Sequence, residues 1–208
     1  MAETIMIIGA GDEQVPAYKL ARSRGYIVIG TDLNIDAPGL RFADHVLIAS
    51  TRDAVETARQ ALALNAITPI NGVMTIANDV PLTVATVAEA LDLKSVSLQA
   101  ALNVSDKLLM KRCFSSSGVA CPWFTEIFTP DDIRRYFDED PNGLFVVKPV
   151  DGRGARGVLL IDKDIDPTWA IQESISWGDS GRVIMERFVP GLQLSTESFL
   201  INGKCFTP

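Results

Sequence analysis

The chain has 208 residues, with 26 aspartate and glutamate against 19 lysine and arginine side chains, and a formal net charge of −7 at pH 7. This acidic balance, without any run of lysine and arginine, argues against a nucleic-acid partner. Hydrophobic residues at 47% and charged residues at 22% are typical of a folded, soluble protein and exclude a disordered chain. No apolar stretch is long enough to span a membrane, and the length allows one large or two smaller domains.

Cysteine and histidine are too scarce for a disulfide framework or a zinc site. The cysteines Cys113, Cys121 and Cys205 are odd in number and form no Cys-x-x-Cys spacing, and His45 is the single histidine. The first residues lack the basic region and the cleavage site of a signal peptide. We therefore expect a cytoplasmic protein.

The first hundred residues alternate short apolar runs with helical patterns. The expected strands are 4–8, 26–30, 46–48 and 72–74, and the expected helices are one ending near residue 24, then 53–64 and 81–91. This alternation predicts a Rossmann-like α/β domain with a parallel sheet over residues 1–100.

A Gly-x-Gly motif, Gly9 and Gly11, follows the first expected strand, and Asp32 lies about 20 residues further on, where a ribose-binding acid would stand in a dinucleotide site. The third glycine of that fingerprint would fall at Gln14. The motif therefore fits either an NAD(P) site or a plain tight turn. Asp32 and Asn34 follow strand ends, so with the two glycines they are candidates for binding a small substrate.

Residues 144–161 predict a β-hairpin with a basic, glycine-rich tip. An apolar strand over 144–147 leads into Lys148, and a second apolar run covers 158–161. The glycines between them are Gly152, Gly154 and Gly157. Such a loop can turn backbone N–H groups into one concavity, and Lys148, Arg153 and Arg156 would suit a polyanion such as a triphosphate. The alternative is an ordinary hairpin with solvated arginines; a Walker A loop is excluded because no helix follows.

A helix is expected from Asp106-Lys107 to about residue 115, with Ser105 as its N-cap. A lysine in the first turn is electrostatically unfavourable, so Lys107 is either well solvated or directed at an anion. Further along, 182–188 predicts a strand, and 194–201 and 205–206 predict strands joined by a turn at Asn202-Gly203.

Three motifs occur in a fixed order: Asp106-Lys107, then Val147-Lys148-Pro149 with its glycine loop, then Glu186-Arg187-Phe188-Val189-Pro190-Gly191. This order resembles the ATP-grasp superfamily of carboxylate–amine and carboxylate–thiol ligases, whose relatives include biotin carboxylase and carbamoyl-phosphate synthase. The resemblance implies an α/β pre-ATP-grasp domain at 1–100 and an α+β N-terminal ATP-grasp subdomain at 101–188, with a lid at about 120–187. Residues 189–208 would begin an incomplete C-terminal subdomain.

The resemblance also implies an ATP site. Lys107 and Lys148 match the lysines that hold the phosphates, and the glycine loop matches the mobile cover of the β- and γ-phosphates. The backbone of the Glu186 strand would read adenine. Two positions depart from the family pattern: Gln193 replaces a ribose-binding acid, and Arg156 replaces a small hydroxyl residue. The matched positions are Lys107, Lys148, Gly152, Arg153, Gly154, Ala155, Arg156, Gly157, Glu186, Arg187, Phe188, Val189 and Gln193.

By the same resemblance, ATP would phosphorylate a small carboxylate or bicarbonate, and an amine or thiol would attack the acyl phosphate. Magnesium would be held mainly by acids beyond the last residue, because Glu197 is the only acid after the Glu186 strand. We therefore expect an N-terminal fragment that is inactive alone, with a homo-oligomer left open. The alternatives are an NAD(P)-binding oxidoreductase and a non-catalytic nucleotide-binding module.

Overall fold

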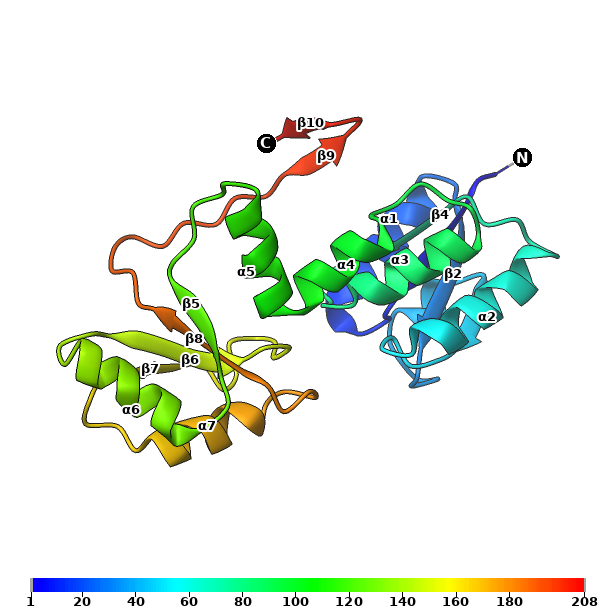
Figure 1. Cartoon of the computed structure of the whole chain (residues 1–208). Helices are drawn as coiled ribbons and strands as arrows, with labels where there is room; N and C mark the ends of the chain where they lie inside the picture. Colours follow the sequence, from blue (N-terminus) through cyan, green and yellow to red (C-terminus); the bar gives the residue numbers. More distant parts are fainter. Residues whose placement is uncertain (1, 208) are drawn as a thin grey trace.

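The computed structural model describes residues 2–207, and its first unit is built on one parallel sheet (Figure 1). The strands are β1 (Thr4–Ile8), β2 (Ile27–Asp32), β3 (His45–Ile48) and β4 (Gly72–Thr75), in the order β3-β2-β1-β4. The helices are α1 (Val15–Ser23), α2 (Ala54–Asn65) and α3 (Pro81–Ala90), with single 3-10 turns at Asp12–Gln14 and Leu40–Phe42. The predicted Rossmann-like sheet is confirmed.

Strand β1 is apolar from Ile5 to Ile8 because both of its faces are covered. Met6 and Ile8 belong to a core with side chains of α2 and α3, whereas Ile7 packs with Tyr18 of α1 on the other face. Successive strand residues point to opposite faces, so one apolar strand can serve two helical layers. This arrangement places the carboxyl ends of all four strands, and the turns that follow them, at one edge of the sheet.

The second unit contains a four-stranded sheet with β5 (Phe124–Ile127), β6 (Phe145–Pro149), β7 (Leu159–Ile161) and β8 (Val183–Arg187), in the order β5-β8-β6-β7. All pairings in it are antiparallel. One face packs on α6 (Pro130–Glu139) and α7 (Pro167–Ile175) around a buried core that includes Phe145, Val147 and Met185. Ile184 points to the opposite face, where it meets Leu108 and Val150.

Two helices connect the units: α4 (Leu98–Ser105), which packs against α3, and α5 (Lys107–Ser116), which supplies Leu108 to the second sheet. In Figure 1 they run through the middle of the molecule, between the two sheets. The expected boundary at residue 100 falls inside α4, a helix that the sequence analysis did not predict. A short hairpin of β9 (Phe199–Ile201) and β10 (Lys204–Phe206) follows an exposed segment. None of the helices within 2–207 has both the length and the apolar character that crossing a membrane requires.

Several local predictions were wrong. Asp106, not Ser105, caps α5: its carboxylate accepts the N–H of Leu109 at 2.8 Å, while Ser105 ends α4 and its hydroxyl donates to Ala101. Strand β6 extends beyond the expected 144–147 to Pro149, which lies opposite Val183. The expected strand over 194–201 is reduced to β9, since nothing pairs with its first half among the described residues. The predicted turn at Asn202-Gly203 is confirmed, with positive φ at both residues.

Candidate functional site

The junction of α4 and α5 directs Lys107 at the base of the glycine loop. The Lys107 ammonium donates to the carbonyl of Gly152 at 2.6 Å and to that of Val150 at 3.3 Å, and its backbone N–H also donates to Val150. Burial, and then the nearby charge of Lys148, lower the pKa of Lys107. Lys107 is therefore not a freely solvated surface lysine, and its side chain is half-buried.

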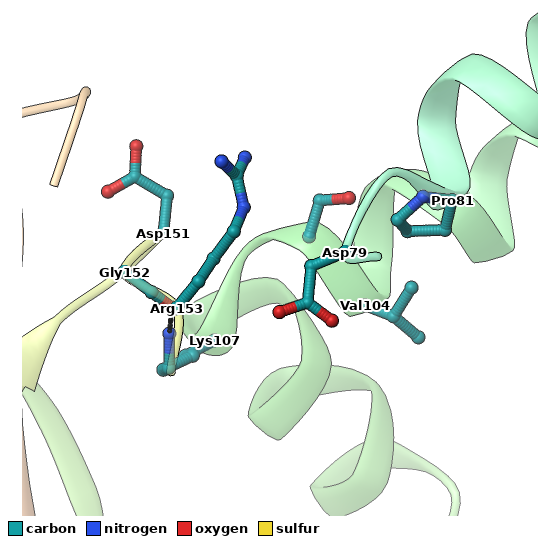
Figure 2. Close-up of a pocket in the computed structure, with 8 residues that line it drawn as sticks. Asp79, Pro81, Val104, Lys107, Asp151, Gly152 and Arg153 are labelled. Atoms are coloured by element: carbon teal, nitrogen blue, oxygen red, sulfur yellow. Dashed lines mark hydrogen bonds between the residues drawn. The ribbon is translucent and has the colours of Figure 1, made fainter. Parts of the chain in front are cut away.

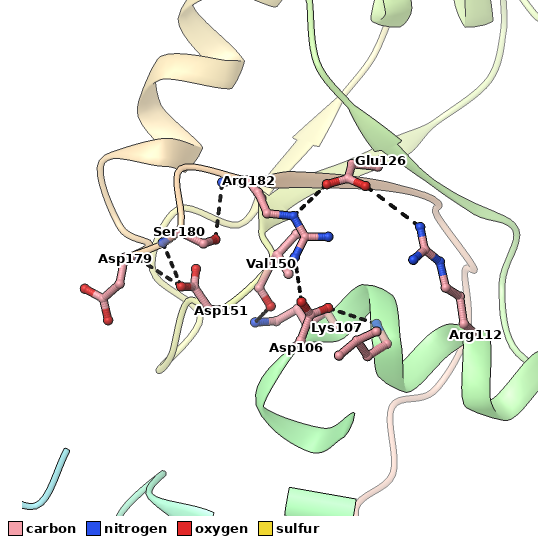
Figure 3. Close-up of polar contacts among 10 residues, drawn as sticks. Asp106, Lys107, Arg112, Glu126, Val150, Asp151, Asp179, Ser180 and Arg182 are labelled. Atoms are coloured by element: carbon pink, nitrogen blue, oxygen red, sulfur yellow. Dashed lines mark hydrogen bonds and ion pairs between the residues drawn. The ribbon is translucent and has the colours of Figure 1, made fainter. Parts of the chain in front are cut away.

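The position of α5 is fixed by an ion-pair network that Figure 3 shows. The guanidinium of Arg182 bridges the carboxylates of Asp106 and Glu126, with both contacts at 2.7 Å. Arg112 lies 3.8 Å from the other oxygen of Glu126. Because Asp106 immediately precedes Lys107, this network connects the start of α5 to strands β5 and β8.

A buried group of charges lies between α5 and the second sheet. The Lys148 ammonium is 2.8 Å from one carboxylate oxygen of Glu186, and the Lys111 ammonium is 3.1 Å from the other. Glu186 and Lys111 are 6% and 8% exposed, so both groups have left water. Strand register explains the first contact, since Glu186 lies opposite Val146, two residues from Lys148 on the same face.

The glycine loop is fixed at both ends. The carboxylate of Asp151 accepts the backbone N–H groups of Asp179 and Ser180, as Figure 3 shows, and the Ser174 hydroxyl donates to the carbonyl of Gly157 at 2.9 Å. A Cβ at Gly157 would lie 2.9 Å from the Trp177 ring, so a side chain cannot be accommodated there. Between these ends the chain adopts positive φ at Gly154, Ala155 and Gly157.

Two adjoining cavities lie beside the loop. One of about 290 Å³ is lined by Lys107, Lys148 and the loop from Gly152 to Arg156. The other, of about 280 Å³, extends toward the first unit and includes Asp79 and Pro81, at the start of α3. Figure 2 shows Arg153 and Asp79 extending from opposite sides of this second cavity, with Lys107 near its base. The structure therefore brings both predicted lysines and the glycine loop together around one space.

The residues after Glu186 are arranged differently. The side chain of Arg187 turns to the opposite face of the sheet, where it pairs with Asp140 and lies 4.9 Å from the centre of the Phe145 ring. The backbone N–H of Phe188 donates to Leu144 at 2.9 Å. Val189 is 63% exposed, and Gln193 and Glu197 are also exposed. Within residues 2–207, no group of three or more His, Cys, Asp or Glu side chains could hold a metal ion.

The residues predicted at the parallel sheet line a separate crevice of about 700 Å³, which includes Gly9, Gly11 and Asp32 but not Asn34. One oxygen of Asp32 accepts the N–H of Ala10 at 2.9 Å, and the other accepts that of Asn34 at 3.0 Å. Gln14, at the third position of the fingerprint, donates from its amide to the carbonyls of residues 76 and 77. These polar groups hold the turns of the sheet edge together.

Sequence reasoning missed two features of the lysine cavity. Lys111 lies one helical turn after Lys107, a spacing that places both on the same face of a helix and could have indicated a shared role. Asp79 was not among the predicted site residues, yet it lines both cavities beside the loop. No sequence signal pointed to the role of Asp151, because its partners are almost thirty residues away.

Comparison with known proteins supports the same architecture. No model of a known protein family and no curated protein matches the chain. Among solved structures, it is similar to phosphoribosylglycinamide synthetase from Anaerococcus prevotii (20% identity, TM-score 0.72), covering 100% of this chain and 51% of that one. It is also similar to L-amino acid ligase from Bacillus licheniformis (22%, 0.77, covering 99% and 49%) and to N5-carboxyaminoimidazole synthetase from Staphylococcus aureus complexed with ADP (19%, 0.71, covering 95% and 50%).

The chain thus spans about half the length of these solved proteins. It has the fold of the corresponding part of the ATP-grasp ligases, as the order of the three motifs predicted. Identities near 20% establish the fold alone, so the activity has to be argued from the site.

Proposed function

We propose that this chain is the nucleotide-binding part of an ATP-dependent ligase of the ATP-grasp type. Lys107 and Lys148 would contact the ATP phosphates, and the loop 152–157 would cover them. The observation that carries this proposal is that two lysines from different elements line one cavity of about 290 Å³ whose wall is the glycine loop. Backbone N–H groups and ammonium groups around one space are suited to phosphate oxygens.

The local charge supports an anionic ligand. The chain as a whole carries a net charge of −7, yet the cavity lining places Lys107, Lys148, Arg153 and Arg156 against one carboxylate, that of Asp79. Excess positive charge inside a protein is unfavourable unless something compensates it. A bound polyphosphate would supply that compensation, which is the physical reason to expect one at this position.

The proposed reaction transfers the γ-phosphoryl group of ATP to a carboxylate or bicarbonate, and an amine or thiol then displaces phosphate from the acyl phosphate. Lys107 and Lys148 would neutralise charge on the phosphoryl oxygens, and the loop would exclude water from the labile intermediate. Magnesium, when bound, would add charge neutralisation at the same oxygens. We assign no magnesium ligand among residues 2–207, and Glu197 stays a weak candidate.

For the adenine, we assign the backbone of residues 186–189, with Phe188 or Val189 as an apolar wall and Gln193 near the ribose. For the small carboxylate substrate, we assign the crevice at the parallel sheet, lined by Gly9, Gly11 and Asp32. An NAD(P) site in that crevice has less support, because both oxygens of Asp32 already accept backbone N–H groups.

Thermal unfolding with added nucleotides tests the proposal. ADP or ATP should raise the melting temperature more than NAD or NADP, and a ligand at roughly 100 Kd should add about 2.7 kcal/mol of stability. The Lys148→Met variant should lose this stabilisation, whereas Lys94→Met, which removes an exposed lysine, should keep it. Stabilisation by NAD and not by ADP would overturn the proposal in favour of an oxidoreductase.

A further inference from the structure

Lys111 lies close to the lysine cavity but does not line it. It extends from α5 one turn after Lys107, and its ammonium lies 3.1 Å from Glu186. The other oxygen of Glu186 is 2.8 Å from the ammonium of Lys148. One carboxylate is therefore shared by two ammonium groups, of which only Lys148 belongs to the cavity wall.

The two lysines differ in their freedom to move. The side chain of Lys148 is 20% exposed and reaches the cavity, whereas that of Lys111 is 9% exposed. Among the described residues, neither lysine makes an aligned hydrogen bond to Glu186, so both contacts are ion pairs and the exposure of the side chain is what distinguishes them. Lys148 can leave Glu186 for another anion, while Lys111 stays beside it.

This arrangement determines how much positive charge faces the cavity. With Lys111 present, the negative charge of Glu186 is already balanced. The positive charge of Lys148 therefore remains available for a ligand in the cavity. Without Lys111, Glu186 would become the full counter-ion of Lys148, and any phosphate would have to compete with it across a low-dielectric contact.

We propose that Lys111 is a positioning residue that acts through Glu186 to leave the charge of Lys148 free for the phosphates of the bound nucleotide. This inference rests on the proposed nucleotide site and adds a third lysine that does not touch the ligand. An alternative role would be purely structural, with Lys111 only balancing Glu186 in the folded protein.

Calorimetric titration with tripolyphosphate, ADP and adenosine separates these roles. Lys111→Met should weaken binding of tripolyphosphate and of ADP about tenfold and leave adenosine within about twofold, whereas Lys111→Arg should restore binding. Lys94→Met is the control, because it also removes one lysine charge, but from an exposed position outside the site. It should change none of the three affinities by more than about twofold.

The Glu186→Gln background completes the test. If Lys111 acts through Glu186, adding Lys111→Met to Glu186→Gln should change tripolyphosphate affinity by less than about twofold. This comparison also serves if Lys111→Met alone fails to fold, since the double variant removes both charges together. An equal loss in both backgrounds, or a parallel loss of adenosine binding, would overturn the inference while the proposed function stands. A wild-type chain that binds neither ADP nor tripolyphosphate would overturn both.

Discussion

The crevice at the parallel sheet and the lysine cavity beside the glycine loop both combine glycines with charged residues, but they use them differently. In the crevice, Asp32 and Gln14 direct their polar atoms to backbone groups of neighbouring turns. Beside the lysine cavity, Lys111 and Lys148 share the buried carboxylate of Glu186, and the cavity itself is lined by two lysines and two arginines against one aspartate. The first set of polar groups is satisfied by the fold itself, whereas the second is left with excess charge.

The difference separates a motif that folding requires from a motif that we assign to ligand binding. Gly9 has φ near +95°, and a Cβ there would lie 2.9 Å from the Asn78 amide, so glycine is needed for the turn itself. Gly154 also has positive φ, but nothing lies within 4 Å of the position its Cβ would take. The open space around Gly154 belongs to the loop that we propose covers the phosphates.

The largest expected effect is a difference in the free energy of unfolding between alanine substitutions at these two glycines. Gly9→Ala adds both backbone strain and a steric clash, so we expect a loss of about 3 kcal/mol in the free energy of unfolding. Gly154→Ala adds strain alone and should cost about 1 kcal/mol. Urea denaturation of the two variants measures the contrast, and equal losses would show that the loop is as tightly constrained as the sheet edge.

The next effect concerns nucleotide affinity. Lys148→Met removes a charge-assisted contact to phosphate, worth about 2 kcal/mol, and should weaken ADP binding by roughly 30-fold. Asp32→Asn should leave ADP affinity within about twofold, because we assign the nucleotide to the other region. Titration calorimetry checks both values. A large loss of ADP affinity in Asp32→Asn would place the nucleotide in the crevice.

The third effect is on pH dependence. Burial, and then the charge of Lys148, lower the pKa of Lys107 from its ordinary 10.5. An anion binds the protonated form, so ADP affinity should fall several-fold as pH rises through that lowered pKa, at a pH below the ordinary value for lysine. Folding stability responds in the opposite sense, because there the unfolded chain binds more protons and this group's contribution rises with pH.

Lys107→Arg provides the control for this pH effect, because arginine keeps its charge throughout the range. ADP affinity should then be nearly independent of pH. The same pH slope in the wild type and in Lys107→Arg would assign the dependence to another group.

The smallest effect is expected where the two regions meet. Arg52, at the rim of the crevice, lies 3.7 Å from Asp179, whose backbone N–H donates to Asp151 at the start of the glycine loop. Both side chains of this pair are more than half exposed. Exposed pairs of this kind contribute little, so Arg52→Gln should change the free energy of unfolding by less than about 0.5 kcal/mol. A loss above about 1 kcal/mol in thermal unfolding would show that the regions are coupled more strongly than this contact suggests.

Much of this architecture could be predicted from the sequence, because local signals were strong. Apolar runs such as 4–8 predicted buried strands of the parallel sheet, and the resemblance carried by the ordered motifs around Lys107, Lys148 and Glu186 implied the fold of the second unit. The structure brings those three residues together.

The remainder depended on contacts that a linear pattern does not contain. The pairing of Lys111 with Glu186 joins residues 75 positions apart and requires the register of β6 on β8 and the packing of α5. The α4–α5 boundary was misjudged because Ser105 and Asp106 are both good capping residues, and only the turn geometry selects Asp106. Within residues 2–207, the exposed hairpin at 199–206 pairs with no third strand.

The fixed ends of the glycine loop have a consequence for limited proteolysis. Between its two fixed ends the loop is exposed at Gly154, Ala155 and Arg156. Trypsin should therefore be able to cleave the peptide bond after Arg156. The two pieces would nevertheless stay together, because β6 pairs with both β7 and β8 and the Asp151 carboxylate is held by residues on the far side of the cut. A cleaved chain would therefore keep the mass and shape of the intact one until it is denatured, and an occupied phosphate site would slow the cleavage.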